Sequence, residues 1–276
     1  MALKKSIKVR KYLFIDMKTV EPQIKTVEYF KDLFFNTGEF TYFVGRFFKE
    51  LFRPPFFPRE FIKQSFQTGY KSFPLVAITS FIIGLVLTLQ SRPSLVEFGA
   101  ESLLPGMISN SIIKEIGPVI TALLCAGKIG SGIGAELGSM RVTEQIEALE
   151  VSAINPYKYL VVTRVLSTTI MVPLLIVFTD LIGLYGSYVA MNIHTDIGLR
   201  RFFTEALVHI DFFDVFPAFI KSFFFGFFIG IIGCYKGYNA KGGTESVGRA
   251  ANSAVVSASL AVFVLDMIAV QITDLL

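Results

Sequence analysis

Five long apolar stretches constrain the fold of this chain more than any other feature. A helix needs about 20 mostly apolar residues to cross the hydrocarbon core of a membrane. Five stretches have about this length or slightly more: Phe73–Gln90, Leu103–Ala126, Val165–Met191, Val215–Tyr235 and Ala250–Ile272. Hydrophobic residues make up 53% of the chain and the net charge is only +4, which argues against a nucleic-acid-binding protein. The sequence predicts an all-α integral membrane protein with five spans.

Lysine and arginine concentrate on one side of these spans. The residues before Phe73 hold 14 of the 26, Lys128–Arg164 holds 4 and Tyr235–Arg249 holds 3, whereas the two remaining loops hold 3 together. Because cytoplasmic loops retain Lys and Arg, the N-terminus is predicted to be cytoplasmic. After five crossings the C-terminus is predicted to be periplasmic.

The region before the first span divides into two parts. Residues 1–26 are predicted to be a cytoplasmic tail, in which the longest apolar run is too short for a signal peptide. Residues 27–71 alternate Phe with charged side chains, and on a helix Phe43, Phe47 and Leu51 share one face. This pattern favours a helix in the membrane interface over a helix of a soluble domain, followed after Pro58 by a second short helix. The five-span domain is expected to cover residues 72–276.

A glycine-rich run, CAGKIGSGIGAELG, begins at Cys125. It lacks the order of a P-loop, because Lys128 is followed by Ile129 where Ser or Thr is required, so the chain is not expected to hydrolyse ATP itself. A small-residue ridge at four-residue spacing lets a second helix approach closely. Three such ridges predict tight helix packing: Ala126, Gly130, Gly134 and Gly138; Gly226 and Gly230; and Ala250, Ala254 and Ala258.

A charged segment separates the second and third spans. At helical spacing Val142, Ile146, Leu149 and Ala153 form an apolar stripe, and three glutamates crowd toward the other side. A cytoplasmic amphipathic helix is therefore predicted over Arg141–Ala153. It serves either to receive motion from a partner protein or as an ordinary connector.

Two longer stretches of the chain carry a likeness to known proteins. The first is KEIGPVITALLCAGKIGSGIGAELGSMRVTEQIEALEVSAINPYKYL, from Lys114. The second is YKGYNAKGGTESVGRAANSAVVSASLAVFVLDMI, from Tyr235. Both resemble the MlaE/YrbE permeases, the membrane subunits of lipid ABC transporters that work with MCE proteins. The likeness runs from about Phe40 to the end of the chain.

This resemblance implies that the segment after the second span is a coupling helix that binds a cytoplasmic MlaF-like ATPase, which holds the ATP and Mg. The candidate coupling residues are Arg141, Glu144, Gln145, Glu147, Leu149 and Glu150. The other implied partners are a second copy of the chain, a periplasmic MlaD-like MCE protein and often a MlaB-like STAS-domain protein. The implied substrate is a lipid, first of all a glycerophospholipid and alternatively a sterol or another hydrophobic molecule. The implied location is the cell inner membrane.

Charged residues inside the spans are costly and tend to face a cavity or a partner. They are Lys114, Glu115, Asp180, Lys221 and Asp266. We predict that Lys114, Glu115, Lys221 and Asp266 lie on the substrate pathway, and the resemblance supports this for Lys114 and Glu115, which take the place of an Arg–Glu pair. Alternatively, Lys221 pairs with Asp266 or Asp180, or extends its ammonium to the interface.

The remaining expectations concern assembly and chemistry. A homodimer with a shared cavity is predicted, because five helices enclose little space alone and small-residue ridges need facing partners. Cys125 and Cys234 are expected to be packing residues, with no metal site. An ion-coupled secondary transporter would call for inverted repeats and broken helices. A membrane enzyme would call for clustered histidines or acids, yet the two histidines, His194 and His209, fall in an outer loop.

Overall fold

The structure, a computed structural model, describes residues 37–275 apart from 194, 209 and 211. Within this part of the chain every regular element is a helix. Five helical segments are long and apolar enough to cross a membrane: Pro58–Glu97, Glu101–Val142, Tyr157–Asn192, Val215–Tyr238 and Glu245–Thr273. The prediction of an all-α chain with five spans is therefore confirmed. The predicted tail 1–26, residues 27–36, His194 and His209 lie outside the described residues.

The chain divides into two compact units, Met1–Lys49 and Glu50–Leu276. Residues 37–51 are helical. This helix stops before Pro54 and Pro55, since proline lacks the N–H that a helix interior requires. All helices from Pro58 onward belong to the second unit.

The first two spans are built from several helical pieces in direct succession. In the first span α2 (Pro58–Ser65) and the π-helix η1 (Phe66–Tyr70) lead into α3 (Phe73–Glu97). The second span contains the 3₁₀ turn η2 (Glu101–Leu103), α4 (Leu104–Ser111), the π-helix η3 (Ile112–Ile116), α5 (Gly117–Cys125), the π-helix η4 (Ala126–Gly130) and α6 (Ser131–Val142).

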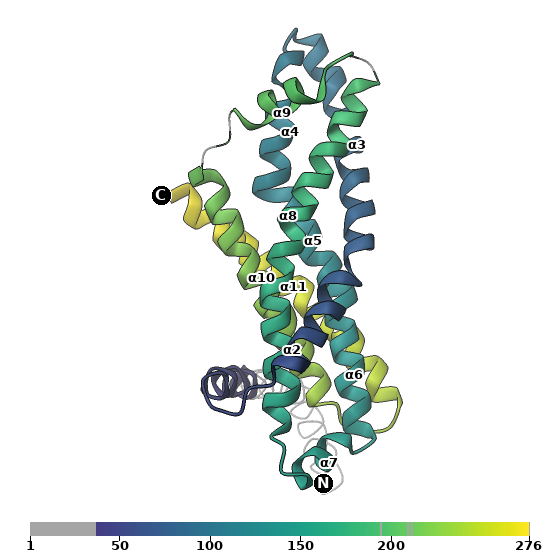
Figure 1. Cartoon of the computed structure of the whole chain (residues 1–276), viewed down its shortest axis with the longest axis vertical. Coiled ribbons are helices and arrows are strands. Elements are labelled where there is room, and N and C mark those ends of the chain that lie inside the picture. Colours follow the sequence, from purple (N-terminus) through teal and green to yellow (C-terminus); the bar gives the residue numbers. More distant parts are fainter. Residues whose placement is uncertain (1–36, 194, 209, 211, 276) are drawn as a thin grey trace, which may run out of the picture. The chain divides into compact units, whose positions relative to one another are not determined.

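The remaining spans are more regular. The short helix α7 (Gln145–Val151) precedes the third span, which consists of the π-helix η5 (Tyr157–Val162) and α8 (Thr163–Asn192). The helix α9 (Leu199–Leu207) follows at the outer end, and α10 (Phe212–Tyr238) and α11 (Glu245–Leu275) are the last two spans. Figure 1 shows α4 and α9 near one end of this unit and α6 and α7 near the other.

Glycines allow close contact between three pairs of helices. A Cβ atom on Gly134 of α6 would lie 3.2 Å from the carbonyl oxygen of Ala250 and 3.2 Å from Cβ of Ala254, both on α11. A Cβ on Gly226 of α10 would lie 2.5 Å from the carbonyl oxygen of Thr168 on α8. Gly84 of α3 meets the backbone of Gly183, also on α8. The small-residue ridges thus lie at helix contacts within a single chain.

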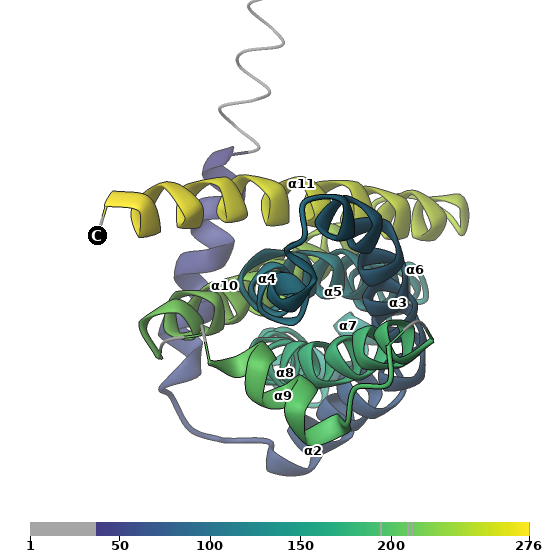
Figure 2. The ribbon, with the colours of Figure 1, turned by 90° about the horizontal axis from the view of Figure 1, so that it is seen from above.

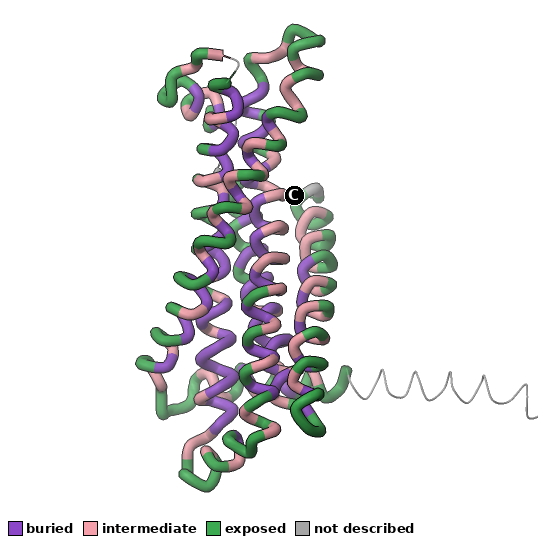
Figure 3. Tube along the Cα trace, turned by 90° about the vertical axis from the view of Figure 1, so that its right-hand side faces the viewer, coloured by how far each residue is buried: buried purple, intermediate pink, exposed green. Residues whose placement is uncertain are grey.

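This finding corrects one argument made from the sequence. The ridge of Gly130, Gly134 and Gly138 was expected to need a second copy, but α10 and α11 of the same chain occupy it. The ridges therefore do not argue for a dimer. Figure 2 shows α11 along one side of the helices of this unit, and in Figure 3 many of its residues are intermediate or exposed. Its exposed apolar residues include Leu260, Phe263 and Met267.

An apolar cluster stabilises the predicted outer end of the bundle. Leu104, Ile108 and Ile112 of the second span pack with Leu184 and Met191 of α8 and with Phe202 of α9. All six side chains are buried. This cluster fixes the start of η3, which carries two of the predicted substrate-pathway residues.

Candidate functional site

Three of the charged residues predicted on the substrate pathway come together from three different spans. Nζ of Lys221, on α10, lies 3.0 Å from Oε2 of Glu115 on η3 and 2.9 Å from Oδ1 of Asp266 on α11. Of the alternatives considered for Lys221, pairing with Asp266 is thus what the structure contains, and Glu115 joins as a second carboxylate. We call Glu115, Lys221 and Asp266 the span triad.

The triad has more negative than positive charge. The Lys221 side chain is only 6% exposed, whereas Asp266 is 18% and Glu115 46% exposed. A buried ammonium is stable only when it is paired and hydrogen-bonded, and two carboxylates meet this need. Because Glu115 is the more exposed of the two, it is the one that can leave Lys221 for water at the smaller cost.

The local backbone explains how Glu115 reaches Lys221. A π-helix has a wider turn than an α-helix, and such turns are often found at functional sites. The π-helix η3 contains both Lys114 and Glu115, and Gly117 and Pro118 follow it directly. Pro118 offers no N–H to the carbonyl four residues before it, which favours a wider turn there. Lys114 is half-buried beside Glu115.

Asp180, the other acidic residue predicted within a span, lies elsewhere. It belongs to α8, where its Oδ1 contacts Gly117. This oxygen is buried and accepts no hydrogen bond from the described residues.

A buried ion pair that the sequence did not predict joins α8 to α6. Nη2 of Arg164 lies 2.9 Å from Oε1 of Glu136, and Nη1 of Arg164 donates a hydrogen bond to the carbonyl oxygen of Leu160 at 3.0 Å. Arg164 is 2% exposed and Glu136 45%. Both residues had been assigned to the water-facing segment between spans. The position of Arg164, directly before the long apolar run that begins at Val165, was the one feature of the sequence that could have indicated a buried arginine.

The predicted helix over Arg141–Ala153 is wrong in one respect, because it is not continuous. Arg141 and Val142 complete α6, and α7 begins only at Gln145. Thr143 follows α6 and donates its hydroxyl to the carbonyl oxygen of Ser139 at 2.9 Å, and Glu144 adopts a left-handed conformation with φ 57°. Ala153, with φ 59°, lies beyond α7, where the N–H of Ile154 bonds to the carbonyl of Leu149, as in a Schellman motif.

This break changes the predicted faces of the segment. Within the stripe only Ile146 is fully buried, and Leu149 is half-buried. The carboxylate of Glu147 turns back and pairs with Arg141. Gln145 donates to the hydroxyl of Thr143 at 3.0 Å. The exposed acidic residues of the segment are therefore Glu144 and Glu150.

Cys125 and Cys234 are both buried free thiols. No group of His, Cys, Asp and Glu suited to a metal ion occurs in the described part of the chain.

Comparison with known proteins identifies the family. The family model described as "Permease MlaE" matches residues 61–272. A probable ABC transporter permease protein of Rickettsia conorii is 38% identical over 229 residues, which is 83% of this chain and 88% of that protein. The intermembrane phospholipid transport system permease protein MlaE of Haemophilus influenzae is 32% identical over 208 residues, 75% of this chain and 80% of that protein.

A plant relative matches a smaller share of its own length. The chloroplastic protein TRIGALACTOSYLDIACYLGLYCEROL 1 of Arabidopsis thaliana is 30% identical over 210 residues, which is 76% of this chain and 60% of that protein. The matched residues 61–272 contain the span triad, the Arg164–Glu136 pair and α7. The chain is a multi-pass ABC transporter permease subunit and is not itself an ATPase. It belongs to the MlaE permease family.

Proposed function

We propose that this chain moves glycerophospholipids between the inner membrane and a periplasmic MCE protein, driven by a separate cytoplasmic ATPase. The observation that carries the proposal is the span triad, in which one buried ammonium has two carboxylate partners from two other spans. The name of the Haemophilus influenzae relative supports phospholipid as the substrate class.

The triad offers a way to bind and release a phosphate diester. Lys221 is buried and already paired, so an incoming lipid phosphate has to replace one of its carboxylates. Glu115 is the partner that can turn toward water, and the neighbouring Lys114 then adds a second cation to the phosphate. Return of Glu115 to Lys221 displaces the phosphate. The two states differ in one partner of Lys221, and in both of them its buried ammonium keeps two anionic partners.

The coupling to ATP hydrolysis is proposed to run through α7. Glu144 and Glu150 are exposed there and are available to basic or polar groups of the ATPase. From Val142 back to Ile112 the chain is helical without an intervening loop. A push on α7 therefore acts through α6 and α5 on η3, which holds Glu115. In this proposal two copies of the chain work with two ATPases.

Transport by the reconstituted complex tests this proposal. The full chain, with its ATPase and MCE partners, is placed in liposomes that contain a fluorescent phospholipid, and ATP-dependent transfer to the MCE protein is measured. Lys221→Met should lower transfer at least about tenfold, because the phosphate loses its charge-assisted partner. Lys241→Met, at an exposed lysine between α10 and α11, is the matched control.

The test has two outcomes that overturn the proposal. Transfer by Lys221→Met at the control rate would remove the triad from the lipid pathway. Mass spectrometry of lipid retained by the purified complex tests the substrate class independently. A sterol or another lipid without phosphate as the main retained species would overturn the glycerophospholipid assignment.

A further inference from the structure

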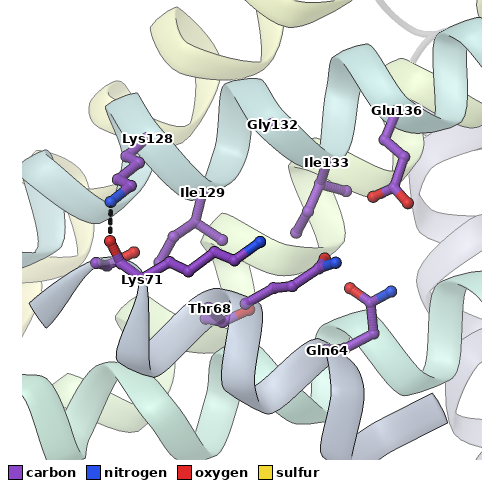
Figure 4. A pocket seen from close by; sticks show the side chains of 10 residues that line it. Gln64, Thr68, Lys71, Lys128, Ile129, Gly132, Ile133 and Glu136 are labelled. Atoms are coloured by element: carbon purple, nitrogen blue, oxygen red, sulfur yellow. Dashed lines mark hydrogen bonds between the residues drawn. The ribbon is translucent and has the colours of Figure 1, made fainter.

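A polar cavity separates the first and second spans, away from the span triad. It has a volume of about 260 Å³ and is lined by the end of α2, η1, the turn between η1 and α3, η4 and α6. Gln64, Thr68, Lys71, Lys128 and Glu136 are among the lining residues, and Figure 4 shows their side chains around the opening. The distribution of Lys and Arg places this end of the bundle at the cytoplasmic side.

Lysine ammonium groups dominate the charge of the cavity. In Figure 4 the Lys71 side chain extends across it, between Ile129 and Gln64, and its ammonium has no ion-pair partner among the described residues. Lys128 donates a hydrogen bond to the carbonyl oxygen of Lys71, which uses one of its three protons. The only carboxylate in the lining is Glu136, and Arg164 neutralises it. The cavity therefore carries excess positive charge.

The walls present further hydrogen-bond donors. Gln64 and Thr68 are buried polar residues that line the cavity, and the amide nitrogen of Gln64 uses one of its two protons in a hydrogen bond to Oε1 of Glu60 at 2.8 Å. Ser72, also in the lining, is 2% exposed and has a hydroxyl without a hydrogen-bond partner in the described structure. Two π-helices, η1 and η4, form opposite walls, and π-helical turns are frequent at functional sites. Two ammonium groups, amides and hydroxyls around one space are the donor set that binds phosphate.

We propose that this cavity is a second lipid site, which holds the phosphate of a phospholipid headgroup from the cytoplasmic leaflet, with Lys71 as its main ligand. Ligand pockets usually measure about 300–1,000 Å³, so a space of 260 Å³ takes a headgroup and not a whole lipid. The acyl chains have an apolar surface close by. Leu75, Ile78 and Ile82 form an exposed stripe along α3 that begins one turn after Lys71.

The stripe favours a lipid over free phosphate as the ligand. A phosphate held at Lys71 positions the attached glycerol at the start of α3, where apolar side chains continue into the membrane. The choice of a phospholipid rests on the proposed function, but the site uses different residues from the span triad. Binding here captures a headgroup at the membrane surface before or after it passes the triad.

Binding measurements without ATP test this inference. The full chain, purified with its ATPase in uncharged detergent, is titrated with dihexanoyl phosphatidylglycerol and, separately, with glycerol 3-phosphate. The titrations are done with Lys221 intact and with Lys221→Met, so that the two sites are counted separately. Lys71→Gln should weaken the second lipid site about tenfold, through loss of one charge-assisted hydrogen bond.

Three matched variants make the test specific. Lys71→Arg keeps the charge and should retain binding, and Lys241→Gln removes a lysine outside the cavity and should have no effect. Gly132→Leu should mimic Lys71→Gln by filling the cavity, since a Cβ on Gly132 meets no atom within 4 Å. Unchanged lipid binding by both Lys71→Gln and Gly132→Leu would overturn the site.

The two probes separate the possible sources of phosphate. Glycerol 3-phosphate that binds as tightly as the short-chain lipid would overturn the lipid assignment in favour of a soluble phosphate ester. Failure of this inference remains distinct from failure of the proposed function, because the latter is measured as transport. A complex that loses transport with Lys221→Met yet binds lipid normally with both Lys71→Gln and Gly132→Leu would contradict only the second site.

Discussion

The buried pair of Arg164 and Glu136 and the span triad are both ion clusters between spans, but they differ in balance. Arg164 has one carboxylate partner and a backbone carbonyl, which together satisfy two arms of its guanidinium. Lys221 has two carboxylates for one ammonium. A balanced pair has nothing to exchange, so it is suited to holding α6 against α8. The triad has a surplus anion, so one partner can be replaced without leaving Lys221 alone.

The two ion clusters also differ in their cation, which is an arginine in the Arg164–Glu136 pair and a lysine in the span triad. Arginine presents a rigid planar fork that favours one fixed geometry, whereas a lysine ammonium is a point charge on a flexible stem. The structure has the arginine near the predicted cytoplasmic ends of α6 and α8 and the lysine within α10. The comparison therefore predicts a structural role for Arg164 and a functional role for Lys221.

Arg164→Met should have the largest effect. Removing one partner of a buried pair typically costs 3–5 kcal/mol, and we expect about 3 kcal/mol, since Glu136 is 45% exposed and stays partly hydrated. Thermal unfolding of the purified chain in detergent measures this loss. Arg164→Lys keeps the charge but not the planar fork, so its thermal stability should lie between that of the parent chain and that of Arg164→Met. A Met variant as stable as the parent would refute the structural role.

Gly134→Ala should have the next largest effect, because Gly134 lies on α6 two residues before Glu136. The new Cβ would lie 3.2 Å from the backbone oxygen of Ala250, so α6 has to move away from α11, at a cost of about 1–3 kcal/mol. Gly132→Ala is the matched control on the same helix. Its Cβ meets nothing within 4 Å, so a gain of up to about 1 kcal/mol in helix propensity is expected. Equal unfolding temperatures for both variants would contradict the close packing.

Neutralising the whole triad should change stability little. The triple variant Glu115→Gln, Lys221→Met and Asp266→Asn removes all three charges of the triad together. Replacing a whole buried ion cluster often changes the free energy of unfolding very little. We expect a change below about 1 kcal/mol in unfolding, together with loss of ATP-dependent lipid transfer. A triple variant that is as unstable as Arg164→Met would show that the triad is structural, and one with normal transfer would show that its charges do not serve transport.

Reversing Glu144 and Glu150 to Lys should have the smallest effect on stability. Both are exposed, and surface substitutions usually stay within about 0.5 kcal/mol. The double variant should nevertheless lose bound ATPase in a pull-down, because like charges then meet at the proposed contact. Glu147 is left unchanged, since it pairs with Arg141. Glu97→Lys, an exposed change at the other end of the bundle, is the control. Full ATPase binding by the double variant would rule out the charge contact.

The parts of the fold that follow from local pattern were predictable. Hydropathy alone located the five spans, and four-residue spacing located the face of α6 that α11 covers. The break at Glu144 was not predictable in this way, because a left-handed residue leaves the apolar spacing on either side almost unchanged. The π-helices have no period of their own in the sequence. The Arg164–Glu136 pair depends on how two spans are placed side by side, which the sequence pattern does not contain.

From the sequence the site was predicted as a set of charged residues that are costly to place inside a membrane. The contacts between these residues were not predicted. Lys221, Asp266 and Glu115 were all expected on the pathway, and pairing of Lys221 with Asp266 was one of the alternatives considered. Their meeting at one ammonium depends on the wider turn of η3. For the same reason Asp180 was grouped with the other charges although it contacts Gly117 and is not part of the triad.

The two π-helices that flank α5 have a mechanical consequence. Each holds one residue more than the corresponding α-helical turns would need, and α5 is the nine-residue segment between them. If the surplus residue passed from one to the other, α5 would rotate by about 100° and advance by about 1.5 Å, while α4 and α6 kept their positions. Such a screw motion changes which side chains of the second span face α10 and α11. The middle segment of the second span, α5, can thus rotate about its own axis while the helical segments on either side of it stay in place.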